Sequence, residues 1–505
     1  MASTIFFRIL NRSQNPTTNA SLLLARSYCT GRNASVSNLF LRISPLGDPS
    51  HSVVPVLDQW MEEGKKVKKP ELQHIARELR ARRRYRQALE VSEWVSCKKL
   101  WPFSAGDHAV QLDLIGRVRG LDSAESYFKN LSDQDKIDKT YGALLNCYVR
   151  EGLVDKSLSH MQIMREMGFA FTPLNYNNIM CLYTNTGQLE KVPDVLSEMK
   201  KNGVSPDNFS HRLCINSYGA RSDINNMEKV LEQMESLPHI SLDWTTYAMV
   251  ANYHIKASIH EKALIYLKKC EEKVNKDALG YNNLISLYAS LGNKDEMMRV
   301  WGLEKSNCKK QSNKDYITML GSLVKLGELE ETEKLLKEWE STCYCYDFRV
   351  PNILLLGYSQ KGLIEKAEAF LQGIVKKGKT PTPNSWSILA AGYLDKQNME
   401  KAYECMKEAL AVVAENKGWR PKDKVISSIL SWLSESVDIE NVEAFLSSLK
   451  PVVTMNREMY HALIKAYLRA GKEVGGLLES MKADNIDENE ETEKLLSSRQ
   501  QKPDR

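Results

Sequence analysis

The chain has 505 residues, of which 42% are hydrophobic and 26% are charged, a balance typical of soluble proteins. No apolar run approaches the roughly eighteen residues that a membrane-spanning helix needs. With 69 basic and 64 acidic residues the net charge is only +5. The composition therefore predicts a soluble chain without a membrane partner and with a mild basic excess.

The N-terminal segment is rich in arginine and serine, and residues 1–47 contain no Asp or Glu. Such a composition is typical of an organelle transit peptide. Arg26-Ser27-Tyr28 resembles a mitochondrial processing site, so we expect a transit peptide over residues 1–28. Its removal takes away three arginines and leaves a net charge of about +2. The expected location is the mitochondrial matrix, with the chloroplast as the alternative; an unstructured N-terminus without an address is also open.

A linker with some helix is expected over residues 29–70, and the densest basic patch of the chain follows. It has two readings of equal weight: contact with nucleic-acid phosphates, or the solvated end of a capping repeat. The candidate phosphate-binding residues are Arg80, Arg82, Arg83, Arg84 and Arg86.

A segment layout that begins with a large side chain recurs every 34 to 36 residues, with one step of 40. The stretched step carries an insertion near residues 415–421. Internal repeats with a period of roughly 20 to 50 residues are typical of repeat architectures such as solenoids. The ten clearest starts are Tyr141, Tyr176, His211, Tyr247, Tyr281, Tyr316, Pro351, Trp386, Ile426 and Tyr460.

Each unit is typical of two helices joined by a turn. A second large side chain, usually tyrosine, follows seven residues after the start and so lies on the same helical face. A glycine four residues later, such as Gly187, suits a left-handed helix cap. We therefore predict an all-α solenoid of about 10–12 antiparallel helix pairs over residues 71–483. The recurring tyrosines are expected to pack between units and not to stack on bases, and Pro193 and Pro351 to fall in first helical turns.

The unit opens with Tyr-Asn-x-Leu/Ile-Ile, turns at Gly and closes with Met-x-x-x-Gly-x-x-Pro-Asp. It resembles the pentatricopeptide repeat, most clearly at residues 176–207 and in Tyr281-Asn282-Asn283-Leu284-Ile285. Tetratricopeptide units place Trp, Leu-Gly and Tyr in the first helix, which this chain does not. The resemblance covers about four fifths of the chain, and the uniform spacing is similar to the P-type subclass of plant organellar proteins.

What the resemblance implies is sequence-selective binding of single-stranded RNA, one base per repeat. Two positions would choose the base: the residue after the opening aromatic, and the last residue of the unit. The implied pairs are Asn177 with Asp207 for uracil, Asn282 with Ser312 for cytosine, Ser427 with Asn456 for adenine, and Asn352 with Thr382 as a weak pyrimidine reader. Other units depart from the pattern, for example Gly142, Arg212 and Ala248. Asn and Ser are also common helix caps, which is the alternative for each residue.

Nothing in the sequence predicts catalysis. The nine histidines form no metal-binding motif, no two of the ten cysteines form a Cys-x-x-Cys pair, and no glycine-rich phosphate loop occurs. We expect no enzyme, cofactor, metal site or small-molecule substrate. Residues 484–505 are acidic and then basic, and are expected to be a disordered tail.

The predicted function is an RNA-binding protein that acts in mitochondrial RNA stability, processing or translation, with single-stranded organellar RNA as its partner. The alternative is a structural repeat protein associated with the mitochondrial ribosome, or a protein-binding scaffold. This alternative is motivated by the mild net charge and by the many repeats that lack a recognisable pair of base-reading residues.

Overall fold

The computed structural model describes residues 38–47, 51–170, 172–238, 240–413, 418–435 and 439–497. The predicted transit peptide lies outside the described residues. All regular structure within these ranges is helical, and no strand occurs there. The chain divides into two units, Met1–Lys273 and Val274–Arg505.

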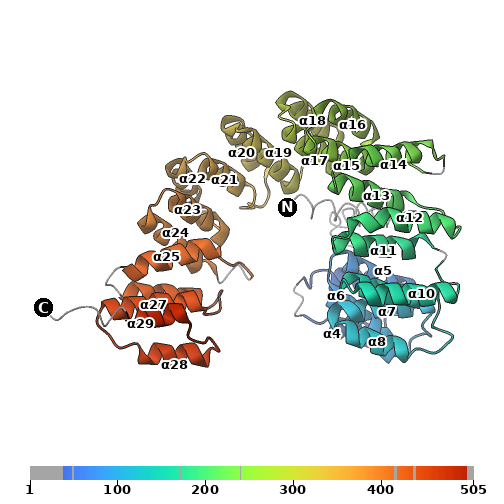
Figure 1. Ribbon diagram of the computed structural model, residues 1–505, viewed down its shortest axis with the longest axis horizontal. Helices are drawn as coiled ribbons and strands as arrows, with labels where there is room; N and C mark the ends of the chain where they lie inside the picture. Colours follow the sequence, from blue (N-terminus) through green and yellow to red (C-terminus); the bar gives the residue numbers. More distant parts are fainter. Residues whose placement is uncertain are drawn as a thin grey trace. The chain divides into compact units, whose positions relative to one another are not determined.

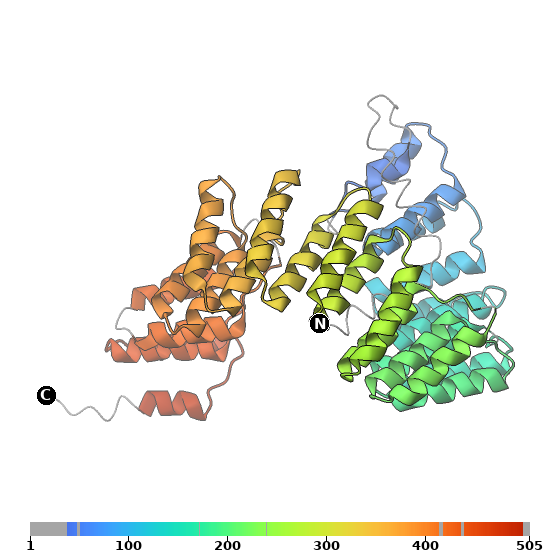
Figure 2. The same cartoon turned by 90° about the horizontal axis from the view of Figure 1, so that it is seen from above.

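The helices of the first unit come in consecutive pairs that lie side by side in two perpendicular views (Figure 1, Figure 2). They are α3 (Leu39–Ile43), α4 (Val54–Glu62), α5 (Lys69–Ala81), α6 (Tyr85–Cys97), α7 (Ala105–Val118), α8 (Leu121–Lys129), α9 (Asp138–Arg150), α10 (Val154–Glu166), α11 (Pro173–Asn185), the short 3-10 helix η1 (Leu189–Lys191), α12 (Val192–Lys201), α13 (Asn208–Ala220), α14 (Ile224–Ser236), α15 (Trp244–Lys256) and α16 (His260–Lys273).

The second unit repeats the arrangement. Its helices are α17 (Ala278–Ser290), α18 (Lys294–Asn307), α19 (Asn313–Leu326), α20 (Leu329–Thr342), α21 (Pro351–Gln360), α22 (Ile364–Lys376), α23 (Pro383–Asp395), α24 (Met399–Ala411), α25 (Asp423–Glu435), α26 (Ile439–Leu449), α27 (Arg457–Arg469), α28 (Gly475–Ala483) and α29 (Glu490–Ser497).

Within each unit the first helix of a pair packs on its partner and on the first helix of the next pair. Thus α11 contacts α12 and α13 in the first unit, and α21 contacts α22 and α23 in the second. Between α5 and α28 the described residues form twelve such pairs, which confirms the predicted all-α repeat fold and the predicted number of pairs. Because each pair contacts mainly its neighbours, the core continues from pair to pair.

The turns between paired helices keep the register that the sequence predicts. Gly187, Gly292 and Gly362 all have positive φ, between 71° and 78°. Where a unit lacks this glycine, another residue adopts the same left-handed conformation, as at Ser222 and Ser258 with φ of 62° and 59°. The geometry of the turn is therefore retained even where the residue best suited to it is absent.

The recurring tyrosines join adjacent pairs, as predicted. In the second unit the Tyr358 hydroxyl donates to Glu333 Oε1 at 2.6 Å, and Lys366 Nζ donates to the same oxygen at 2.7 Å. Lys366 also lies 4.8 Å from the centre of the Tyr358 ring. The same arrangement recurs in Tyr393 with Glu368 and Lys401, and in His254 with Glu228 and Lys262. These side chains are committed to holding successive pairs together.

Helix starts also follow the sequence pattern. Pro193 and Pro351 each fall in the first turn of a helix, as predicted, because a proline there loses no hydrogen bond. In α11 the side chains of Tyr176, Ile179 and Tyr183 are buried, at the spacing that places them on one face.

The predicted disordered tail differs from the structure over residues 490–497, which form α29 and pack on α27. Thr492 is fully buried there, and its hydroxyl lies 2.9 Å from His461 Nε2. The acidic composition of the segment suggests solvent exposure, but polar contacts of His461 with Thr492 and Glu491 join the segment to the last repeat. Residues 498–505 of the predicted tail lie outside the described residues.

Candidate nucleic-acid interface

The predicted base-reading pair Asn177 and Asp207 comes together in the structure. Asn177 Nδ2 lies 3.2 Å from Asp207 Oδ1, and Asn177 Oδ1 accepts from the Ser210 hydroxyl at 2.7 Å. Asp207 is also the N-cap of α13, since its carboxylate accepts from the Ser210 backbone N–H at 2.8 Å. Asn177 is only 1% exposed, whereas Asp207 is exposed.

The pair Asn282 and Ser312 is linked through a third residue. Asn282 Nδ2 donates to Asp315 Oδ1 at 2.6 Å, and Asp315 accepts from the Ser312 hydroxyl at 2.9 Å. Ser312 is the N-cap of α19 and is exposed, while Asn282 is 4% exposed. As in the first pair, the buried asparagine of the first helix is joined to the N-terminal turn of the next first helix.

The remaining two pairs are less directly joined. The Ser427 hydroxyl donates to Glu458 Oε2 at 2.6 Å, and Glu458 lies two residues after the N-cap Asn456. Asn352 is 6% exposed, and Thr382 is half-buried with its hydroxyl 3.0 Å from Ser385. No hydrogen bond joins Asn352 to Thr382 within the described residues.

Each of three predicted base-reading residues is followed by a second polar residue on the same first helix. Asn178 and Asn283, each one residue after a buried asparagine, are half-buried, and so is Ser428 after Ser427. The first two opening motifs carry a doubled asparagine and the third a doubled serine, so neighbouring positions have identical chemistry. Spacing alone does not separate them, because one helical step changes the face by about 100°.

The unit that opens at His211 shows the same joint, although the sequence placed it outside the pattern. Arg212, on α13, is 2% exposed, and its Nη1 lies 3.4 Å from Asp243 and 2.7 Å from the Thr245 hydroxyl. Asp243 is the N-cap of α15. The contact between a first helix and the next N-cap is therefore a recurrent structural joint.

The structure contradicts the phosphate-binding prediction for Arg84. Its guanidinium donates to the backbone oxygens of Ser44, at 3.0 Å, and Ile43, at 3.1 Å, at the end of α3. A third bond goes to the Leu46 oxygen. The sequence could not reveal this role, because these carbonyls lie about forty positions away. Arg84 therefore ties α3 to the start of α6.

The other arginines of the basic run have different surroundings. Arg82 donates to the Ser44 hydroxyl at 2.9 Å, and Arg86 lies 3.5 Å from Glu90. Arg83 is exposed, in a left-handed turn with φ of 61°. Arg80 Nη2 donates to Asp113 Oδ2 on α7 at 3.2 Å. Phosphate contact thus remains a hypothesis for the residues of the run that stay exposed.

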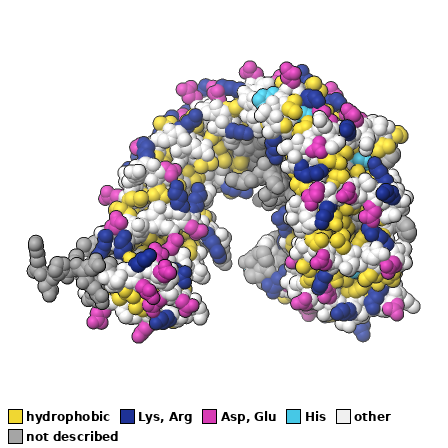
Figure 3. All heavy atoms as spheres, viewed as in Figure 1, with side chains coloured by type: hydrophobic (Ala, Val, Ile, Leu, Met, Phe, Trp, Pro, Cys, Tyr) yellow, Lys and Arg dark blue, Asp and Glu magenta, His cyan; other side chains and the backbone are white. Residues whose placement is uncertain are grey.

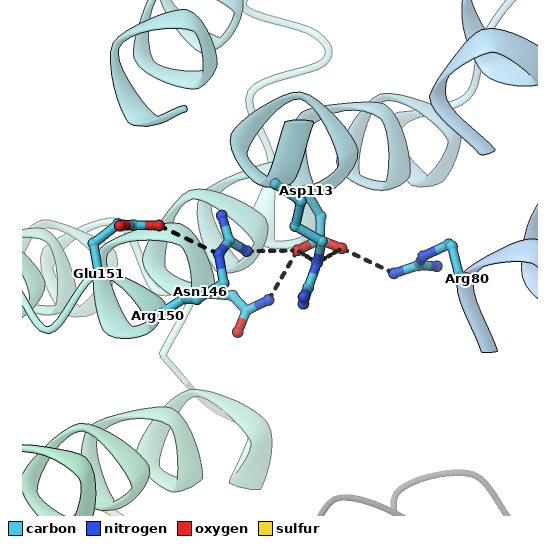
Figure 4. Close-up of polar contacts among 6 residues, drawn as sticks. Arg80, Asp113, Asn146, Arg150 and Glu151 are labelled. Atoms are coloured by element: carbon cyan, nitrogen blue, oxygen red, sulfur yellow. Dashed lines mark hydrogen bonds and ion pairs between the residues drawn. The ribbon is translucent and has the colours of Figure 1, made fainter. Parts of the chain in front are cut away.

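Three arginines surround one buried carboxylate on α7 (Figure 4). Asp113 is 5% exposed and accepts from Arg80 at 3.2 Å, Arg117 at 3.0 Å and Arg150 at 3.2 Å. Burial alone would raise the pKa of Asp113, but the three guanidinium groups outweigh it and hold the pKa below its usual value. The cluster joins α5, α7 and α9 through one charge.

The second helices carry paired charges. Lys269 lies 3.0 Å from Glu235 of the preceding second helix, and Lys305 lies 2.7 Å from Glu338 of the following one. Basic and acidic side chains are accordingly interspersed over the face shown in Figure 3. Such exposed pairs contribute little stability each, but they offset the charge of these lysines.

Neither a metal centre nor a membrane span is found in the described part of the chain. No group of three or more potential metal-binding side chains gathers there. No helix among the described residues has the length and apolarity to cross a bilayer.

The paired helices and the joints at their N-caps define a helical-repeat protein. Models of the PPR repeat match residues 139–169, 280–303, 315–341 and 350–378, and a model of the PPR repeat family matches residues 174–219. A mitochondrial pentatricopeptide repeat-containing protein of Arabidopsis thaliana is 48% identical over 482 residues, 95% of this chain and 98% of the relative. The chain belongs to the pentatricopeptide repeat family. This membership agrees with the expectation of a repeat protein that is not an enzyme.

Two further similarities complete the comparison. A large ribosomal subunit protein of Arabidopsis thaliana is 33% identical over 461 residues, covering 91% of this chain and 94% of the relative. The crystal structure of the maize pentatricopeptide repeat protein PPR10 aligns with a TM-score of 0.47 and 18% identity, covering 91% of this chain and 69% of that one.

Proposed function

We propose that the chain is a sequence-selective single-stranded RNA-binding protein of the mitochondrial matrix that acts in RNA stability, processing or translation. The observation that carries the proposal is the recurrent joint between an exposed polar N-cap and a polar residue of the preceding first helix. Asp207 with Asn177, and Ser312 with Asn282 through Asp315, are examples. The acid-free residues 1–28 and the mitochondrial names of similar proteins support the location and a mature chain that begins at residue 29.

The side chains proposed to contact base edges are the exposed caps and the residues that follow the buried asparagines. Asn177 would have to break its bonds to Asp207 and Ser210 before it could bind a base. Asn178 needs no such rearrangement of the joint. Asn177 and Asn282 accordingly hold the caps in place, while the neighbouring residues read the base. An amide or hydroxyl at such a place can both donate to and accept from a base edge.

Separate substitutions of Asn177 and Asn178 in α11 distinguish recognition of the base from stabilisation of the N-cap. Asn178→Ala is expected to change the preferred base at one position of the RNA and to leave the melting temperature within about 1 °C of the wild type, because such surface changes cost little. Asn177→Ala should lower the free energy of unfolding by about 1–3 kcal/mol, because it removes the hydrogen bonds of a buried amide to Asp207 and Ser210. RNA selection and thermal unfolding measure the two effects. A changed base preference in Asn177→Ala alone would contradict this assignment.

A second candidate function is a structural role in the mitochondrial ribosome. The observation that favours it is the 33% identity over 91% of this chain with a large ribosomal subunit protein. Sedimentation of an organelle extract distinguishes the candidates. Co-sedimentation of the chain with the large subunit at high salt supports the ribosomal role, and its presence only in light, ribosome-free fractions contradicts it.

A further inference from the structure

One face of α5 carries a row of polar side chains at helical spacing: Lys69, Gln73, Arg77 and Arg80. Lys69 Nζ and Gln73 Nε2 both donate to Asp107 on α7, each at 2.9 Å. Arg80 is paired with Asp113. Arg77 lies between them, is exposed, and has no hydrogen-bond or ion-pair partner within the described residues. Within the described residues, Arg77 is therefore available to bind a ligand, while its neighbours Gln73 and Arg80 are held by hydrogen bonds.

A pocket of about 260 Å³ opens along this row, between α5, α6 and α7. Its lining includes Gln73, Arg77 and Arg80 of α5, and Trp101 and Phe103 of the α6–α7 connection. Asp107 also lines it, but its carboxylate is paired with Lys69. Both aromatic side chains are only half-buried. The pocket thus combines a cationic edge with aromatic walls, outside the joints at which the proposed base readers lie.

The segment that contains α5 is much more basic than the chain as a whole. Residues 65–86 hold ten lysines and arginines against two glutamates, so the rest of the chain has a net negative charge. The Asp113 cluster adds to this field, because three guanidinium groups pair with the single carboxylate of Asp113, and one of them, Arg150, also pairs with Glu151. Arg150 Nη2 is buried there without a hydrogen-bond partner in the described part of the chain. The local field attracts an anion.

We propose that this pocket binds one nucleotide of single-stranded RNA, with the base beside Trp101 and Phe103 and a phosphate on Arg77, supported by Arg80. The site rests on the proposed RNA-binding function but adds a contact that does not read sequence through the repeat joints. A planar base suits aromatic walls and a phosphate suits a guanidinium, and both lie within one small pocket. An acidic peptide would use the arginines, but it fills the space beside both aromatic residues only where it also carries an aromatic side chain, whereas every nucleotide joins a planar base to a phosphate.

The test compares the chain from residue 29 with its Arg77→Ala, Trp101→Ala and Phe103→Leu variants. Arg299→Ala, which removes an exposed arginine paired with Glu296 in the second unit, serves as the control. Affinity for a selected single-stranded RNA is measured in parallel with saturation-transfer NMR of adenosine 5′-monophosphate. We expect Arg77→Ala and Trp101→Ala to weaken RNA binding at least about fivefold and to remove the saturation transfer. Arg299→Ala should change neither.

Each outcome decides between the two proposals. If the wild type binds RNA but Arg77→Ala and Phe103→Leu bind within twofold of it, the pocket assignment is overturned and the RNA-binding function stands. If the wild type binds no RNA, the proposed function fails, and saturation transfer to the mononucleotide still decides whether the pocket accepts a nucleotide. Competition by N-acetyltryptophanamide, without binding of the mononucleotide, would assign the pocket to a peptide and overturn the proposal. Loss of helical circular dichroism in Trp101→Ala would leave the decision to Arg77→Ala and Phe103→Leu.

Discussion

Asp113→Ala is expected to lower the free energy of unfolding by about 3–5 kcal/mol, the cost of removing one partner of a buried ion pair. The substitution leaves Arg117 and Arg150 half-buried without their common carboxylate. Because Asp113 joins α5, α7 and α9, the loss should be concentrated in the first unit. Chemical unfolding and hydrogen exchange of the amides in these helices measure it.

The control for this variant is Asp122→Ala, which removes an exposed aspartate from α8. The pH dependence gives a second check. Since the folded state holds the pKa of Asp113 below its usual value, the carboxylate stabilises the fold above its unfolded pKa and loses this contribution as the pH falls. The difference between wild type and Asp113→Ala should therefore shrink in acid. Equal stability of the two variants at neutral pH would show that the cluster is dispensable.

Glu304→Met is expected to stabilise the second unit. Glu304, on α18, is fully buried, and both its carboxylate oxygens lack a hydrogen-bond partner among the described residues. Burial and the charge of Asp315 raise its pKa to about 8. Met199 and Met234 occupy the same place at multiples of 35 residues and are equally buried. Methionine is therefore compatible with this position of the repeat.

The gain should depend on pH. A carboxyl whose pKa is raised by folding stabilises the fold fully only below its unfolded pKa, and the contribution is lost as the pH rises toward 8. We expect the free energy of unfolding of Glu304→Met to exceed that of the wild type by about 2–4 kcal/mol near pH 8, and by less near pH 5. Unfolding curves across this range measure the effect, with Glu330→Met, an exposed position of α20, as the control. Parallel curves for wild type and Glu304→Met would refute the argument.

The sequence predicted the repeat fold well, because its signals are local and recur. The opening aromatic, the residue seven positions later and the glycine turn specify each pair of helices, and twelve pairs follow in the structure. The turn at Ser222 shows that the register persists where the glycine signal is missing.

The site was predicted less completely, because it depends on contacts between successive repeats. The sequence placed Asn177 near Asp207 correctly, but burial of Asn177 follows from packing against Ser210 of the next unit. Arg84 was assigned to phosphate because its carbonyl partners near residues 43–46 have no signature in sequence. The docking of α29 through Thr492 was missed for the same reason.

The most direct test of the account is selection from a random pool of single-stranded RNA by the chain from residue 29, at about 150 mM salt so that non-specific phosphate binding is weakened. The account predicts one enriched sequence motif, bound more tightly than about 1 μM, with Asn178→Ala altering a single position of that motif. An unenriched pool, or no RNA bound more tightly than about micromolar, would contradict it.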